Sequence, residues 1–289
     1  MLNSIRSKQI VAIGAVMFLV AFLFTRDIKG LVKPKEETTK GSATAAEANS
    51  EAPAVIDLVA ISTAAKNILG GNLALEINTL EQAYQAAADR DKGFAAKALA
   101  QKWASVDQEV PSALYLEILA NKDKSLGNWV AAGDKFLKAF DNTRDSVLLP
   151  ALLQKANASY KNALAIDSTS IDAKTGLGIT IVDGMGMPMQ GIAMLLDVVK
   201  KDPKNLKANM SLGTFAIKSG QFDKAITRFN DIIAIKPSPD AYFYLATAYE
   251  NLGKNTEAID AYANSKKLAG NPTLSKFIDD KIIELKNKS

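Results

Sequence analysis

A fixed sequence period runs through the last third of the chain and limits its possible folds more than any other feature. The set Leu212-Gly213, Gly220, Ala225 and Phe229 recurs as Leu245-Ala246, Gly253, Ala258 and Tyr262, and each residue number in the second set is larger by 33. A constant period of this length is typical of helical units that stack one on the next. We therefore expect an all-α fold, an array of stacked helical units whose role is to present a surface.

The apolar residues between Gln221 and Lys236 have helical spacing. They are Phe222, Ala225, Ile226, Phe229, Ile232 and Ile233, which together form one stripe along an amphipathic helix. Pro237 ends this helix, because the residue before a proline resists the α region. Gly220 comes just before it, where a tight turn between helices needs a permissive backbone.

These residues resemble the tetratricopeptide repeat, a helix pair with Leu-Gly or Leu-Ala in its first helix and Ala, an aromatic residue and Pro in its second. The most specific copies cover about 206–238 and 239–271, and looser copies contain Leu177-Gly178 and Leu119-Ala120, the second of these covering about 113–140. The resemblance implies an α-solenoid, a right-handed superhelical array of antiparallel helix pairs. It has a helical amino-terminal part at 55–112, repeats at 113–271 and a capping helix at 272–289. The stretch 145–168 fits in part: Ala156, Tyr160, Ala163 and Ile166 resemble a second repeat helix, but no first helix with a glycine turn precedes it.

The composition removes most catalytic chemistry, since the 289 residues include no cysteine and no histidine. A thiolate nucleophile, a cysteine zinc site and a histidine base are therefore excluded. The glycine-rich stretch 184–191 is no phosphate loop, because no Gly-Lys-Ser/Thr follows it. We expect no enzyme activity, no cofactor, no metal and no small-molecule substrate. Catalysis by carboxylates alone is the alternative that stays open.

The net charge of +4 is concentrated at the amino terminus. Residues 1–40 contain seven basic and three acidic residues, which leaves 28 of each sign in the remainder. A nucleic-acid-binding protein needs a clustered basic surface to displace counterions, so we expect no nucleic-acid partner.

Residues 10–24 (IVAIGAVMFLVAFLF) contain no polar side chain. As a helix they span about 22 Å, and extension to Ile5 and Thr25 approaches the roughly 30 Å of a bilayer core. No small-residue cleavage site follows. We therefore predict that residues 1–32 are a single transmembrane anchor with basic flanks. A cleaved signal peptide and a buried soluble helix are the alternatives.

Residues 33–54 lack large apolar side chains and are predicted to be a disordered linker. An anchor, a linker and a repeat array in this order resemble ancillary proteins of the bacterial envelope. We expect a protein of the bacterial inner membrane with its carboxyl-terminal domain in the periplasm, acting as a scaffold for a protein or peptide partner. The alternative is an adaptor that faces the cytoplasm, which a raw count of positive charges on the two sides of the anchor slightly favours.

The resemblance also implies a partner-binding groove lined by the first helix of each pair. Carried over by position, it contains Ile179, Val182, Met210, Thr214, Ile217, Lys218, Phe243, Thr247 and Glu250. The family's clamp for a terminal carboxylate is not expected, since only Lys207 and Lys218 fit it. Several of the groove positions could instead pack against neighbouring helices. Trp103 and Trp129 are interpreted as core residues, and the methionines of 184–191 either fill gaps in a turn or form an adaptable contact surface.

Overall fold

A computed structural model describes residues 56–184 and 186–288. The chain divides into a unit of residues 1–50 and a unit of residues 51–289, and all of the described residues belong to the second unit. The predicted anchor and linker thus lie outside the described residues. Within the part that is described, no helix has the length and apolar character needed to cross a membrane.

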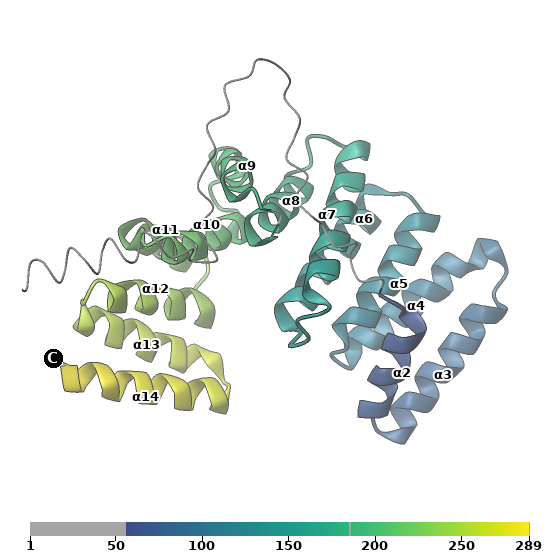
Figure 1. The fold of residues 1–289 in the computed structure, drawn as a ribbon, viewed down its shortest axis with the longest axis horizontal. Coiled ribbons are helices and arrows are strands. Elements are labelled where there is room, and N and C mark those ends of the chain that lie inside the picture. The colour runs from purple at the N-terminus through teal and green to yellow at the C-terminus, as the bar shows by residue number, and fades with distance from the viewer. Residues whose placement is uncertain (1–55, 185, 289) are drawn as a thin grey trace, which may run out of the picture. The chain divides into compact units, whose positions relative to one another are not determined.

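The described residues are helical, which confirms the all-α prediction for this part of the chain (Figure 1). They contain thirteen α-helices and one short 3-10 helix, η1 (Asp89–Asp91). The α-helices are α2 (Leu58–Ile68), α3 (Gly71–Ala86), α4 (Lys92–Ser105), α5 (Glu109–Lys122), α6 (Leu126–Asn142), α7 (Leu149–Ile166), α8 (Ile171–Gly184), α9 (Pro188–Lys201), α10 (Leu206–Lys218), α11 (Phe222–Ile235), α12 (Pro239–Asn251), α13 (Asn255–Ala269) and α14 (Pro272–Lys288).

Each helix from α4 to α14 packs against the next one along the chain. Contacts between alternate helices also join α6 to α8, α8 to α10 and α10 to α12. These four helices therefore form one row, and they are the first helices of the pairs α6–α7, α8–α9, α10–α11 and α12–α13. The sequence had instead paired α5 with α6, because Leu119-Ala120 and Phe136 show the repeat spacing.

Glycines on the first helices make room for large side chains on the second helices. A Cβ at Gly213 would lie 2.8 Å from Cζ of Phe229, which is fully buried. The ring of Tyr160 lies against Gly133 and Gly176 in the same way. These close approaches explain why the Leu-Gly and aromatic positions of the repeat occur together.

The buried residues form several clusters that follow one another along the array. The largest extends from Ala216 to Leu285 and contains Phe229, Leu245 and Tyr262. It includes Ile278 and Leu285 of α14, so this helix covers the end of the last pair. Trp103 is fully buried and Trp129 is 7% exposed, as their interpretation as core residues predicted.

Candidate partner-binding groove

The four first helices enclose an open groove with a volume of about 1040 Å³. We call it the α6–α12 groove. Its lining comprises Asp134, Leu137, Lys138, Asp141 and Asn142 of α6, Tyr160 of α7, Gly176, Ile179 and Asp183 of α8, Lys207, Met210, Ser211, Thr214, Ile217 and Lys218 of α10, and Asp240, Phe243, Tyr244 and Thr247 of α12. Helix α6 belongs to the groove because it lies in the same row as α8, α10 and α12.

Seven of the nine predicted groove residues line this groove. They are Ile179, Met210, Thr214, Ile217, Lys218, Phe243 and Thr247. Six of them are partly buried, and Lys218 is exposed. The apolar members thus keep a surface that a partner could contact. Whether a partner binds them is still a prediction.

Val182 and Glu250, the other two predicted residues, face neighbouring helices. Val182 packs with the buried cluster around Leu195 and Val198, and its Cγ2 atom lies 2.8 Å from the position of a Cβ built on Gly191 of α9. Glu250 accepts a hydrogen bond from the hydroxyl of Tyr262 (2.8 Å) and another from Nζ of Lys281 (2.9 Å). The structure therefore assigns both side chains to helix packing, the alternative that the sequence had left open for such positions.

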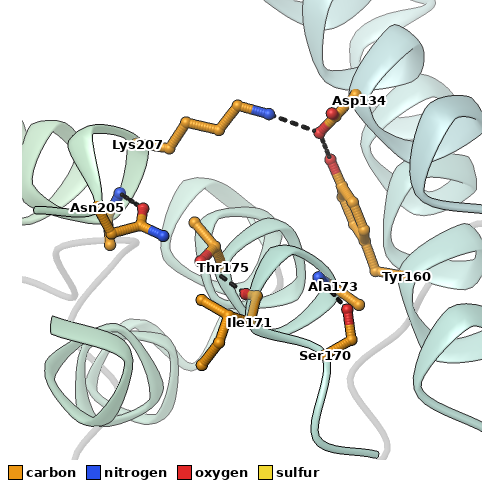
Figure 2. A network of polar contacts seen from close by, with 9 residues as sticks. Asp134, Tyr160, Ser170, Ile171, Ala173, Thr175, Asn205 and Lys207 are labelled. Carbon is orange, nitrogen blue, oxygen red and sulfur yellow. Dashed lines mark hydrogen bonds and ion pairs between the residues drawn. The ribbon is translucent and has the colours of Figure 1, made fainter. Parts of the chain in front are cut away.

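A polar network joins the pairs α6–α7 and α10–α11 at one edge of the groove (Figure 2). The hydroxyl of Tyr160 donates a hydrogen bond of 2.8 Å to Asp134 Oδ1, and Nζ of Lys207 donates one of 2.9 Å to the same oxygen. Burial raises the pKa of Tyr160, and the nearby charge of Asp134 raises it further, so the hydroxyl stays protonated and acts as a donor. Lys207, one of the two lysines that fit the family clamp, is thus already paired.

Capping residues fix the starts of α8 and α10 beside this network. The backbone N–H of Ala173 donates to Oγ of Ser170 (3.3 Å), and the N–H of Ala208 donates to Oδ1 of Asn205 (3.0 Å) (Figure 2). Such caps satisfy backbone donors that the first helical turn leaves unpaired. They hold the helix that bears Lys207 in a defined position.

A second set of charged residues lies at the carboxyl ends of α6, α8 and α10. Asp183 Oδ1 is 3.9 Å from Nζ of Lys218. Loss of solvation raises the pKa of Asp141, Asp183 raises it further, and Lys218 lowers it. Loss of solvation also raises the pKa of Asp183, which Lys218 likewise lowers. Carboxyl groups with shifted pKa values in a concave site are also expected of an enzyme that uses carboxylates alone. The largest cause of the shifts here is loss of solvation, which the wall of any groove produces.

An aromatic cluster forms the α12 side of the groove. Phe243 contacts Tyr244, Tyr262 and Phe277 edge-on or tilted, with ring centroids 5.8, 5.6 and 6.0 Å away. Phe277 of α14 is 48% exposed. The apolar surface of Phe243 thus continues onto the last helix, which the sequence had assigned only to capping.

Sequence reasoning missed the acidic residues of the groove. Asp134, Asp141, Asp183 and Asp240 all line it, but none falls at a position that the repeat pattern singles out. Asp183 and Asp240 could have been assigned to the groove because they lie on predicted first helices. Asp134 and Asp141 could not, because the repeat spacing predicted α6 to be a second helix. Met187 and Met189 of the methionine-rich stretch lie outside the lining and are 57% and 70% exposed at the start of α9.

Comparison with known proteins agrees with this architecture. Residues 210–272, which span most of α10 to α13, match the family model of the tetratricopeptide repeat. These residues are tetratricopeptide repeats. No curated protein matches the chain.

Solved structures of tetratricopeptide-repeat proteins resemble a larger part of the chain. The thermophilic TPR protein TTC0263 of Thermus thermophilus is 15% identical, and the match covers 66% of this chain and 99% of that one with a TM-score of 0.54. MamA is 20% identical over 58% of this chain and 93% of its own, with a TM-score of 0.43. YrrB, a TPR protein with an unusual peptide-binding site, is 14% identical over 70% and 97%, with a TM-score of 0.41. At 15% identity, the match to TTC0263 shows a shared fold and nothing more.

Proposed function

We propose that this protein is a non-catalytic scaffold that holds a segment of a partner protein in the α6–α12 groove. The observation that carries the proposal is that apolar residues of three successive first helices, Ile179, Met210 and Phe243, line one groove and are only partly buried. The repeat fold that displays them is typical of interaction scaffolds. The volume of about 1040 Å³ is at the upper limit of small-molecule sites and suits a peptide.

The groove can be tested by crosslinking in membranes followed by mass spectrometry of the recovered partners. The test variant is the double substitution Met210→Glu and Phe243→Glu, which places two charges on the apolar part of the groove. Its matched control is Leu196→Glu with Leu268→Glu, because these leucines are each 46% exposed on second helices outside the lining. We expect the groove variant to lose partners that the control keeps.

Circular dichroism of both variants provides the check that each one folds. If the folded groove variant recovered the same partners as the unchanged protein, the assignment of the groove would be wrong.

We further propose that residues 10–24 tether the array to the inner membrane of a bacterium, with the array on the periplasmic side. The support is the sequence, in which an uninterrupted apolar segment with basic flanks precedes a polar linker and then the array. Tethering would raise the local concentration of the groove for partners in the same membrane.

A reporter enzyme that is active only outside the cytoplasm, fused after Ser289, tests this orientation. Activity is the expected result. An inactive but well-expressed fusion would instead support the adaptor that faces the cytoplasm. Extraction of the chain from membranes by carbonate would contradict the tether itself.

A further inference from the structure

The charges that line the α6–α12 groove are not balanced. Four aspartates and three lysines line it. Each lysine has an acidic neighbour: Lys138 contacts Glu109 of α5 (2.6 Å), which it shares with Lys135 (2.8 Å), Lys207 contacts Asp134 (2.9 Å), and Lys218 is 3.9 Å from Asp183. Asp141 and Asp240 also line the groove, and neither has an ion-pair partner in 56–184 and 186–288. The groove therefore has an excess of negative charge beside its apolar floor.

The two acids on α6 and α8 are placed where helix stability disfavours them. Asp141 is the second-last residue of α6 and Asp183 is the second-last residue of α8. The carboxyl end of a helix carries partial negative charge, so an acid in the last turn is destabilising. The carbonyl groups of these two helix ends add to the negative potential on this side of the groove.

The negative potential reaches the aromatic side of the groove. Loss of solvation is the largest cause of the raised pKa of Tyr244, and the charges of Asp240 and Asp141 raise this pKa further. Acids from α12 and α6 therefore both act on this one ring. Lys218 is the cation that lowers the pKa of both Asp141 and Asp183, but its side chain is 69% exposed and its Nζ is as far as 3.9 Å from Asp183 Oδ1. A pair of this length in water is weak and can exchange for another cation.

We infer that the occupant of the groove is a segment of another protein in which a lysine or arginine is flanked by apolar side chains. Its cation lies beside Asp141 and Asp183, and its apolar side chains lie on Ile179, Met210 and Phe243. A terminal carboxylate or an acidic segment is rejected by the same charges, since like charge against a groove wall is costly. This inference rests on the proposed function, because it names the chemistry of the partner for the same groove.

The experiment is a selection of random peptides displayed on phage against the purified full-length chain. It is repeated with Asp141→Asn and Asp183→Asn together, which removes both charges but keeps the shapes of the side chains. The matched control, Asp231→Asn with Asp260→Asn, removes two exposed acids from the second helices α11 and α13. Binding of the recovered peptides is then measured by fluorescence anisotropy.

We expect the unchanged chain and the control to select peptides rich in lysine or arginine next to apolar residues. The groove variant should bind these peptides about tenfold more weakly, as for the loss of a hydrogen bond to a charged group, and its own selection should keep the apolar preference without the basic one. Peptides without a basic bias from the unchanged chain would overturn the inference about the partner and leave the groove itself supported.

Two further outcomes separate the failure of the inference from the failure of the proposed function. If Met210→Glu with Phe243→Glu selected the same peptides as the unchanged chain, the groove would not be the binding site and the proposed function would fail. If the unchanged chain selected no peptides, and the change at Asp141 and Asp183 altered its mass in analytical ultracentrifugation, the occupant would be a second copy of the chain. That result would overturn the inference.

Discussion

The packing of Tyr160 gives the sharpest prediction, a loss of stability when Gly176 is changed to alanine. An added Cβ at this position would lie 2.1 Å from Cζ and 2.2 Å from Cε1 of the Tyr160 ring. The ring has no free space to retreat into, because it is fully buried and a Cβ at Gly133 would lie only 2.7 Å from it. A shift of the ring would also strain its hydrogen bond to Asp134.

Two opposing effects decide the sign of this change. Alanine in place of glycine inside a helix usually stabilises by about 1 kcal/mol, whereas overpacking a filled site costs about 1–3 kcal/mol. With contacts as short as these, the upper value applies, and we expect Gly176→Ala to lower the free energy of unfolding by about 2 kcal/mol. The matched control is Gly127→Ala in α6, where an added Cβ meets nothing within 4 Å and no loss is expected.

Urea unfolding followed by circular dichroism and tryptophan fluorescence measures the effect. Trp129 on α6 makes the fluorescence sensitive to the region around Tyr160, which is useful because arrays of repeats can unfold in parts. A double-mutant cycle identifies the cause: after Tyr160→Ala removes the ring, Gly176→Ala should no longer destabilise. An equal penalty in both backgrounds, or a single Gly176→Ala variant as stable as the unchanged chain, would refute the packing argument.

Three further predictions can be checked by the same unfolding measurements. Gly220→Ala should cost about 1–2 kcal/mol, because Gly220 has φ +72° and a side chain strains this conformation, whereas Gly70→Ala at φ −64° should cost little. Lys207→Ala should cost at most about 1 kcal/mol, since its ion pair with Asp134 is partly exposed; a larger loss would mean that the network holds the repeats together. Because the pKa of Asp141 in the folded chain is above its ordinary value of 3.8, its ionisation opposes folding at neutral pH, so Asp141→Asn should raise the urea midpoint at pH 7. That gain should fade below pH 3.8, where the carboxyl group is protonated in both states, and a gain independent of pH would contradict an origin in the ionisation of Asp141.

The helices α10 to α13 could be predicted from sequence because their repeat is local and regular. In α10–α11 the glycine and the aromatic residue that pack together are Gly213 and Phe229, and Ala246 and Tyr262 are separated by the same interval in the next pair. A constant spacing means a constant helix–turn–helix geometry. Such a pattern can be recognised when the sequences of two repeats are aligned.

The pair α6–α7 could not be found in this way, although its packing is of the same kind. The interval from Gly133 to Tyr160 is longer than the interval from Gly213 to Phe229, because α6 and α7 are longer helices than α10 and α11 and because residues 143–148 also lengthen the connection between them. The longer helices and connection change the spacing but leave the contact in place. A search by spacing therefore attached α6 to α5, and the acids of α6 were not considered as part of the groove.

The composition of the groove depends on which side of each helix faces it, and the repeat pattern determines this only in part. Ile179 and Val182 lie one turn apart on α8, yet Ile179 lines the groove while Val182 fits against Gly191 of α9, because the missing side chain lets these two helices approach closely. Likewise Thr247 lines the groove, whereas Glu250 one turn later is held by Tyr262 and Lys281. The partner of a charged residue can lie far away in the sequence, as for Asp134 and Lys207. The apolar floor of the groove thus follows from the repeat, while its charge is determined by the stacking of the repeats, and it is the charge that would select the partner.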